Sequence, residues 1–294
     1  MRLLLLGKDG QVGRELQRAL APLGELIALD RAGADLTQPE RLAATVRELR
    51  PNVIVNAAGY TAVDKAESEP EAARLVNATA PAVLARETAA LGAWLVHYST
   101  DYVFDGTGDL PRAEEAPAAP LNAYGRSKLE GEERIGAAGC KHLILRTSWV
   151  YGTHGDNFPK TMLRLARERE RLRVVDDQIG APTGADWLAD ITAHALRAVH
   201  ERDDLAGTYH ATAHGQTSWH GYASFVIEWA RAHGHSIRTA RGAIEAVPTS
   251  AFPSAARRPH NSGLDNRKLH ATFGLHSPPW QAGVERLLEG LPRT

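Results

Sequence analysis

A tyrosine and a lysine four residues apart could form an acid–base pair. They are Tyr124 and Lys128, in the segment AYGRSKLEGE at residues 123–132. A spacing of four places both side chains on one face of a helix. A phenol has a pKa near ~10, and a neighbouring ammonium lowers that pKa by favouring the phenolate. The spacing therefore predicts that Lys128 tunes Tyr124 as a proton donor, although a surface tyrosine packed on a lysine stem would give the same pattern.

A pair of small hydroxyls precedes this segment. Ser99 and Thr100 lie in HYSTDYVFDG, residues 97–106, where an apolar strand ends. In open α/β sheets, ligands bind beyond the carboxyl ends of the strands. A hydroxyl at that place can donate to a substrate carbonyl while a tyrosine delivers the proton. Thr100 could instead only cap a turn, but its combination with Tyr124 and Lys128 favours a catalytic set.

A glycine-rich turn opens the chain. GKDGQVG follows an apolar strand, opens a helix, and contains Gly7, Gly10 and Gly13. Such glycines let the backbone approach a pyrophosphate, and the helix N-terminus stabilises the anion. Asp30 ends the next strand, roughly ~20 residues downstream, where a carboxylate can bond a ribose hydroxyl. The pattern predicts a dinucleotide site with Asp35 and Leu36 beside the adenine, while the glycines alone would also suit a tight structural turn.

The elements around these motifs alternate between strand and helix. Strands are predicted at residues 2–6, 25–30, 52–59, 93–100 and 141–152, with helices between them. This order predicts an α/β fold with a doubly wound, parallel, Rossmann-type sheet. We expect residues 1–150 to form the dinucleotide-binding domain. Residues 151–294 are expected to form mainly a smaller, irregular substrate domain, with some segments returning to the sheet. Residues 174–184 are predicted to be a loop, and residues 246–266 have little periodicity.

Composition limits the function further. The chain has 294 residues, of which 43% are hydrophobic, with 34 basic and 35 acidic side chains. This balance does not suggest a nucleic acid partner. The single cysteine, Cys140, cannot form an intramolecular disulfide and suits a reducing compartment. The leading apolar run, residues 3–6, is too short for a membrane span. We therefore expect a soluble, cytoplasmic protein with no membrane partner.

Histidines provide a weaker signal. His210, His214 and His220 are close enough in sequence to suggest a metal site, but they have no adjacent cysteine or H-E-x-x-H arrangement. They are predicted to be surface or loop residues. His97 is predicted to be a core or edge histidine of its strand.

The motifs resemble the extended short-chain dehydrogenase/reductases and, more narrowly, the dTDP-4-dehydrorhamnose reductase family. The resemblance runs over almost the whole chain and is carried by GKDGQVGRELQ, RPNVIVNAAGYTAVDKAESEPE, HYSTDYVFDGTG, PLNAYGRSKLEGE, LRTSWVYG, NFPKTMLRLA, DDQIGAPTGADWLAD and AVPTSAFPSAARRPHNSGLD. It implies reduction of the C4 ketone of dTDP-6-deoxy-L-lyxo-4-hexulose to dTDP-L-rhamnose, a sugar used in cell-surface polysaccharides. It also implies NADPH as cofactor with some tolerance for NADH, and a homodimer is one assembly that it allows.

Residue roles follow from the same resemblance. It implies that the catalytic residues are Thr100, Tyr124 and Lys128. The residues implied to bind cofactor are Gly7, Gly10, Gln11, Val12, Gly13, Asp30, Asp35, Leu36, Ala57, Gly59, Tyr60, Thr61, Tyr124 and Lys128. Those implied to bind the dTDP-sugar are Thr100, Asp101, Tyr102, Trp149 and Arg258.

Some positions depart from the family pattern. Gly59 and Tyr60 replace an expected Ala and His, which affects the detailed cofactor contacts. Some relatives hold magnesium between glutamates of a dimer, but Asp186 replaces one expected Glu beside Glu15, so no magnesium site is predicted. An epimerase or dehydratase of the same superfamily remains an alternative. So does a non-catalytic NADP-binding regulatory subunit, although such a subunit should have lost part of the catalytic set.

Overall fold

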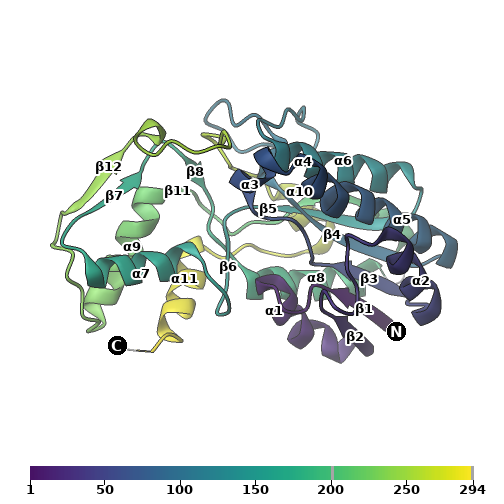
Figure 1. The fold of residues 1–294 in the computed structure, drawn as a ribbon. Helices are drawn as coiled ribbons and strands as arrows, with labels where there is room; N and C mark the ends of the chain where they lie inside the picture. The colour runs from purple at the N-terminus through teal and green to yellow at the C-terminus, as the bar shows by residue number, and fades with distance from the viewer. Residues whose placement is uncertain (200–201, 293–294) are drawn as a thin grey trace.

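The computed structural model describes residues 1–199 and 202–292, and a six-stranded parallel sheet forms its centre (Figure 1). The strand order is β10 (Gly207–His210), β5 (Lys141–Thr147), β4 (Trp94–Thr100), β3 (Val53–Asn56), β1 (Arg2–Leu6) and β2 (Glu25–Leu29). The chain places β2 on one side of β1 and then β3, β4, β5 and β10 on the other side. The turns after β1 and β3 therefore flank the crevice in which such sheets bind ligands. The predicted α/β class and parallel sheet are confirmed.

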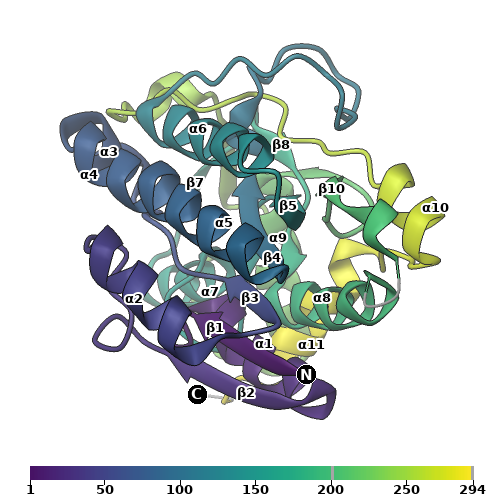
Figure 2. The same cartoon turned by 90° about the vertical axis from the view of Figure 1, so that its right-hand side faces the viewer.

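Helices cover both faces of this sheet. One face carries α1 (Gln11–Leu20) and α8 (Ala185–Val199), and the other carries α2 (Pro39–Leu49), α5 (Ala80–Leu91) and α6 (Ala123–Ala137). Figure 2 shows α2, α5 and α6 in a row along one side of the strands. Leucines that alternate along β1 divide between the two cores, with Leu3 and Leu5 on the α1 face and Leu4 and Leu6 on the α2 face. This double burial explains the uninterrupted apolar strand.

Shorter elements connect the sheet to the site. They are α3 (Val63–Ser68), α4 (Pro70–Arg74), a π-helical segment at Leu75–Thr79 and 3₁₀ turns at Ala21–Leu23, Asp101–Val103, Asp203–Leu205 and Thr249–Ala251. α10 (Arg267–Phe273) packs beside β10 and α8.

A second hydrophobic core lies to one side of the sheet. It is formed by α7 (Phe158–Glu168), α9 (Trp219–Ala232) and α11 (Trp280–Glu289), which lie together in Figure 1. Short strands join around it: β6 (Val150–Tyr151), β7 (Leu172–Val175), β8 (Ile179–Gly180), β9 (Thr183–Gly184), β11 (Thr217–Ser218) and β12 (Ile244–Val247). Within the described residues, no helix is both long enough and apolar enough to cross a membrane.

Several local expectations need correction. Residues 141–152 do not form one strand, because β5 ends at Thr147 and β6 pairs with β9 in a separate sheet. The loop expected at residues 174–184 contains β8, β9 and the end of β7. His210 is not a surface or loop residue: it lies in β10 and is 0% exposed. It was misplaced because β10 takes the sheet edge beside β5, a pairing that no local pattern indicates.

Candidate functional site

The turn after β1 forms a backbone cradle. Gly7 has φ +81°, and a Cβ on Gly13 would lie 2.0 Å from the Gly7 carbonyl oxygen. Only glycine tolerates both the left-handed conformation and this close approach. Gly10 is the N-cap of α1, and no side chain in the described part of the chain caps that end. The first amides of α1 therefore have the arrangement of a helix N-terminus that binds anions, and the phosphate site stays a prediction.

A cavity of about 420 Å³ begins beside this cradle. Six residues predicted to bind cofactor line it: Gly7, Asp30, Asp35, Leu36, Gly59 and Tyr60. Asp30 follows β2 and accepts hydrogen bonds from the Gly33 amide at 3.0 Å and from the Lys8 ammonium at 3.1 Å. These two donors lower the pKa of Asp30, so its carboxylate is ionised beside the cavity.

Other predicted cofactor residues lie outside the lining of this cavity. Gln11 opens α1 and accepts at Oε1 from Asn157, while Val12 packs against the core beneath α1. Ala57 follows β3, and its amide bonds the Leu6 carbonyl. Thr61 is exposed.

The turn after β3 is fixed by a buried asparagine. Asn77 accepts from the Tyr60 amide at 2.8 Å and donates to the Tyr60 carbonyl at 3.0 Å and to Ser127 at 3.0 Å. Asn77 lies in the π-helical segment at Leu75–Thr79, and such segments are frequent at functional sites. The Tyr60 hydroxyl donates to Glu69, whose other oxygen pairs with Lys65. The backbone and side chain of Tyr60 are thus both held at the cavity.

The predicted hydroxyl and phenol meet at the end of β4. Thr100 is the last residue of β4, and its hydroxyl lies near enough to the phenol of Tyr124, in the first turn of α6, to lower the pKa of that phenol. α6 approaches the end of β4 closely: a Cβ on Gly125 would lie 2.2 Å from the Tyr102 carbonyl oxygen. The Asn122 side chain caps the helix by accepting from the Gly125 amide at 2.8 Å. Thr100 also caps the following 3₁₀ turn by accepting from the Tyr102 amide.

Lys128 reaches the same strand from the next turn of α6. Its Nζ donates to the Tyr98 carbonyl at 2.5 Å and lies 3.3 Å from His97 Nε2. Burial lowers the pKa of Lys128 to about 8, against an opposing effect of the Glu132 carboxylate. The amine is therefore close to its own titration at neutral pH.

The pKa of Tyr124 differs in direction from the expectation. Burial of the hydroxyl raises the pKa of Tyr124 to about 12, the nearby Thr100 hydroxyl opposes that rise, and the Asp101 carboxylate adds to it. Desolvation disfavours the phenolate more than the neighbouring donor favours it. In this arrangement the Lys128 amine donates a hydrogen bond to the Tyr98 carbonyl, which belongs to the backbone of β4.

Asp101 is an unusual acid at this place. It is 4% exposed, and Oδ1 accepts from the Thr100 hydroxyl at 3.1 Å. Oδ2 has no hydrogen-bond partner among the described residues, although Ser262 lies near enough to lower the pKa. Burial outweighs these contacts and raises the pKa of Asp101 to about 7.

Two of the predicted substrate residues border the Tyr124 ring. Tyr102 packs edge-on against Tyr124 with ring centroids 5.8 Å apart. Arg258, from the irregular C-terminal segment, lies beside Tyr102 and pairs with Asp64 of α3 at 2.6 Å. The site therefore combines both halves of the chain.

Trp149 lies farther along the same side, between β5 and β6. It has φ +47°, rare for a residue with a side chain, and stacks on Trp219 with centroids 3.6 Å apart. Gly180 makes room for it, because a Cβ there would lie 2.5 Å from the Trp149 ring. Trp149 is half-buried, so it is neither a simple core residue nor fully exposed.

Sequence patterns did not identify several polar residues of the site. Two of them form a buried ion pair near Lys128. The Arg146 guanidinium of β5 donates to both carboxylate oxygens of Glu132, with a shortest N–O distance of 2.6 Å, and the Ser99 hydroxyl donates to the same carboxylate. Asn56 and Asn77 were missed as well. Asn56 could have been noticed as an amide ending an apolar strand, whereas Asn77 gave no local signal.

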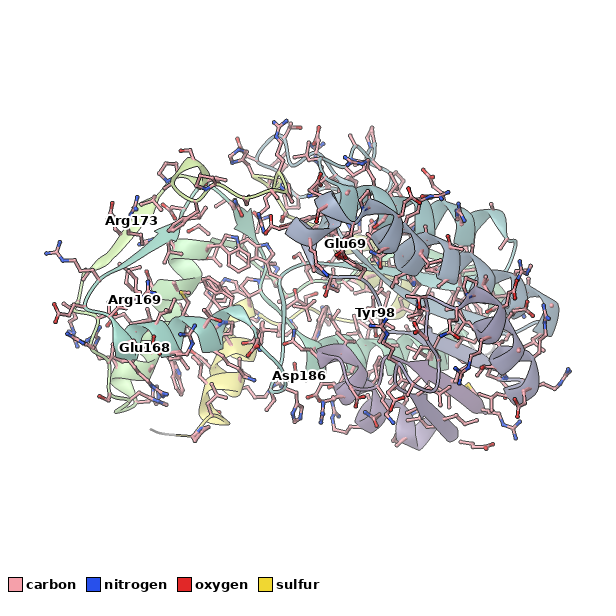
Figure 3. All side chains as sticks on the ribbon, viewed as in Figure 1. Glu69, Tyr98, Glu168, Arg169, Arg173 and Asp186 are labelled. Atoms are coloured by element: carbon pink, nitrogen blue, oxygen red, sulfur yellow. The ribbon has the colours of Figure 1, made fainter. Side chains whose placement is uncertain are left out.

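Glu15 and Asp186 line a different cavity, of about 370 Å³, together with Asp190. Two arginines pair with these acids: Arg18 with Asp190 at 2.8 Å and Arg286 with Asp186 at 2.5 Å. Figure 3 places Asp186 where the sheet and the C-terminal helices meet.

Known proteins are similar to this chain over nearly its whole length. A family model described as the RmlD substrate binding domain matches residues 1–292. The dTDP-4-dehydrorhamnose reductase of Escherichia coli K12 is 56% identical over 295 residues, which cover 99% of this chain and 98% of that protein. Among solved structures, the Bacillus anthracis dTDP-4-dehydrorhamnose reductase in complex with NADP has a TM-score of 0.89 at 36% identity, covering 99% of each chain.

A second solved structure agrees. The dTDP-4-dehydrorhamnose reductase of Clostridium acetobutylicum has a TM-score of 0.89 at 35% identity and covers 98% of this chain and 99% of its own. The resemblance inferred from the sequence motifs is confirmed. The chain belongs to the dTDP-4-dehydrorhamnose reductase family of oxidoreductases.

Proposed function

We propose that the protein reduces the C4 ketone of dTDP-6-deoxy-L-lyxo-4-hexulose to dTDP-L-rhamnose with NADPH. One observation carries the proposal: the Thr100 and Tyr124 hydroxyls lie next to each other at the carboxyl end of β4, near enough for Thr100 to affect the pKa of Tyr124. Two hydroxyls that meet there suit a carbonyl oxygen that gains charge during reduction. When bound, the reduced nicotinamide supplies the hydride.

The roles of the site residues follow from this arrangement. Tyr124 protonates the developing alkoxide, and Thr100 donates to the carbonyl oxygen and stabilises its charge. Lys128 lowers the pKa of Tyr124 once its ammonium is directed toward the phenol and the nicotinamide ribose. The raised pKa of Tyr124 supports a phenol that holds its proton until charge develops on the substrate.

The cofactor residues fit a dinucleotide. We assign the pyrophosphate to the turn at Gly7, Gly10 and Gly13, which packs so closely that a Cβ on Gly13 would lie 2.0 Å from the Gly7 carbonyl oxygen. Asp30 disfavours a 2′-phosphate, but its pairing with Lys8 and the exposed Arg31 beside it offset that effect. NADPH is therefore the proposed cofactor, with NADH also accepted, and no magnesium is proposed.

The substrate residues come from both halves of the chain. We assign the dTDP-sugar to Thr100, Asp101, Tyr102, Trp149 and Arg258, since Arg258 supplies a cation for the diphosphate and Trp149 an aromatic surface. In this assignment four of the five substrate residues lie within residues 1–150, beside the cofactor residues, and Arg258 comes from residues 151–294.

The test is oxidation of NADPH by purified protein, with the dTDP-4-keto sugar generated in the same reaction. Wild type should turn over, and Tyr124→Phe should lose about 10²- to 10⁴-fold in kcat with NADPH affinity kept. Binding of NADPH without oxidation in wild type would contradict the reductase and favour the regulatory subunit. Tightly held NAD that is regenerated in each cycle would favour the epimerase.

A further inference from the structure

A buried histidine contacts the Lys128 amine from the strand beneath it. His97 lies in β4, is 1% exposed, and has Nε2 3.3 Å from Lys128 Nζ. On the other side of the ring, Nδ1 lies 3.1 Å from the Asn56 side-chain nitrogen. Asn56 is the neighbour of His97 in the register of β3 and β4. The ring is therefore held between two polar groups inside the core.

The contacts of Asn56 determine which ring nitrogen carries the proton. Asn56 Oδ1 accepts from the Ala58 amide at 3.2 Å, so the Nδ2 group faces His97. An amide nitrogen only donates, and His97 Nδ1 must then accept. Burial, together with the charge of Lys128, lowers the pKa of His97 well below its usual value, so the ring is neutral. Its single proton lies on Nε2 and points at Lys128.

This proton affects the charge of Lys128. An ammonium has no lone pair and can only donate, so it faces the Nε2–H unfavourably. A neutral amine can accept from Nε2–H while still donating to the Tyr98 carbonyl. The chain from Ala58 through Asn56 and His97 to Lys128 is thus fully hydrogen-bonded only when the amine is neutral.

We propose that His97 is a positioning residue that holds the Lys128 amine at the end of β4 and favours its neutral form. The inference rests on the proposed function of Lys128. Around the amine, Glu132 and Tyr124 lie on its own helix and His97 faces it from β4, while Arg146 of β5 neutralises much of Glu132. Glu132 favours the charged amine and His97 opposes it, which keeps Lys128 able to exchange a proton at neutral pH.

The same chain connects Lys128 to the cofactor cavity. Ala58 lines that cavity beside Gly59 and Tyr60, and its amide is the first donor of the chain. A shift of the turn after β3 would therefore change the position of the Lys128 amine through the side chains of Asn56 and His97. His97 makes the position of the amine depend on the turn that we assign to the nicotinamide half.

The first test measures the proton on the ring without any turnover. In protein labelled with ¹⁵N-histidine, NMR of the side-chain nitrogens should show His97 neutral, with Nε2 protonated and Nδ1 bare, from about pH 5 to pH 8, the range over which an unperturbed histidine changes its charge. Lys128→Met should move the Nε2 signal much more than the Nδ1 signal. An Nδ1-protonated ring, or an imidazolium at neutral pH, overturns the proposal whether or not the protein is a reductase.

The second test uses His97→Leu and His97→Gln. In His97→Leu we expect kcat to fall about 10- to 100-fold with the Kd for NADPH within about twofold of wild type. The basic limb of the kcat–pH profile should also move up by about one pH unit, because the donor that favours the neutral amine is gone. His97→Gln should have a kcat close to that of wild type, because its side chain can still bond the Lys128 amine. Its basic limb should stay shifted as in His97→Leu, because the glutamine amide oxygen can turn to accept from the charged amine.

A matched control separates a catalytic effect from the cost of losing a buried ring. His210→Leu removes an equally buried imidazole from β10 that contacts Arg146 and Phe104 instead of Lys128. It should lower Tm while leaving the pH profile in place. Should His97→Leu fail to fold, His97→Gln carries the test. A basic limb that stays at its wild-type pH in His97→Gln overturns the proposal.

Discussion

The carboxylate of Asp64 and the guanidinium of Arg258 lie 2.6 Å apart, although 194 residues separate them in sequence. Asp64 also accepts from the Ala256 amide at 3.0 Å. One side chain of α3 therefore holds both the backbone of the C-terminal segment and its Arg258 guanidinium. Arg258 in turn lies beside Tyr102 at the proposed substrate site. The ion pair therefore fixes where the Arg258 guanidinium lies relative to the proposed substrate site.

Asp64→Ala should weaken substrate binding more than it slows the chemical step. We expect KM for the dTDP-sugar to rise about threefold to tenfold, with kcat nearly unchanged, because the partly exposed pair orients Arg258 without touching the ketone. Steady-state kinetics measure both constants. Asp204→Ala, which removes a carboxylate from an exposed pair with Arg202, is the control and should change neither. A fall in kcat with KM unchanged would show that Asp64 does more than anchor.

Thr100→Ala and Thr100→Ser should separate the hydroxyl from the methyl group. Removing the hydroxyl takes away one donor at the carbonyl oxygen, which costs about 10²- to 10³-fold in kcat. Serine keeps that donor and should stay within about tenfold of wild type. Single-turnover measurements with saturating NADPH compare the two variants. Equal losses in both would show that packing at the end of β4 is what matters.

Asp101→Asn should stabilise the protein above neutral pH. The pKa of Asp101 is raised from 3.8 to about 7, so the folded state binds the extra proton between these values. The ionised carboxylate therefore costs stability that appears as pH rises through this window and is complete above pH 7. We expect the free energy of unfolding to increase by about 1–3 kcal/mol at pH 8 and very little at pH 4. Urea denaturation at both pH values measures it, and equal changes would contradict the assignment.

Gly180→Ala should displace Trp149. The added Cβ would lie 2.5 Å from the indole ring, too close for any side chain, so the stack on Trp219 must shift. We expect KM for the dTDP-sugar to rise about tenfold while the Kd for NADPH is kept. Gly136→Ala is the matched control, because nothing lies within 4 Å of a Cβ there and α6 should gain about 0.5–1 kcal/mol. An unchanged KM in Gly180→Ala would contradict the assignment of Trp149 to the substrate site.

The local parts of the site could be predicted from the sequence. The turn at Gly7–Gly13 and the helical spacing of Tyr124 and Lys128 depend on a few consecutive residues, and the structure has the turn, the helix and the hydroxyl of Thr100 where expected. The alternation of strands and helices likewise predicted the parallel sheet. Its strands could be recognised because a strand buried on both faces is apolar along its whole length.

Contacts between distant segments could not be predicted in this way. Asn77 holds Tyr60 only because α4, the π-helical segment and α6 pack together, and neither neighbour of Asn77 in sequence indicates this. The direction of the Tyr124 pKa was wrong for a related reason. A four-residue spacing predicts a nearby ammonium, but the burial that outweighs it depends on the whole fold.

The late position of β10 in the chain has a consequence for biosynthesis. By the time residue 147 has left the ribosome, five of the six strands have been made, yet one edge of β5 still carries unpaired amides and carbonyls. That edge is covered only when residues 207–210 arrive and pair with residues 143–146. Exposed strand edges recruit other chains. A nascent chain paused between these points, or a fragment ending there, should depend on chaperones to stay unaggregated.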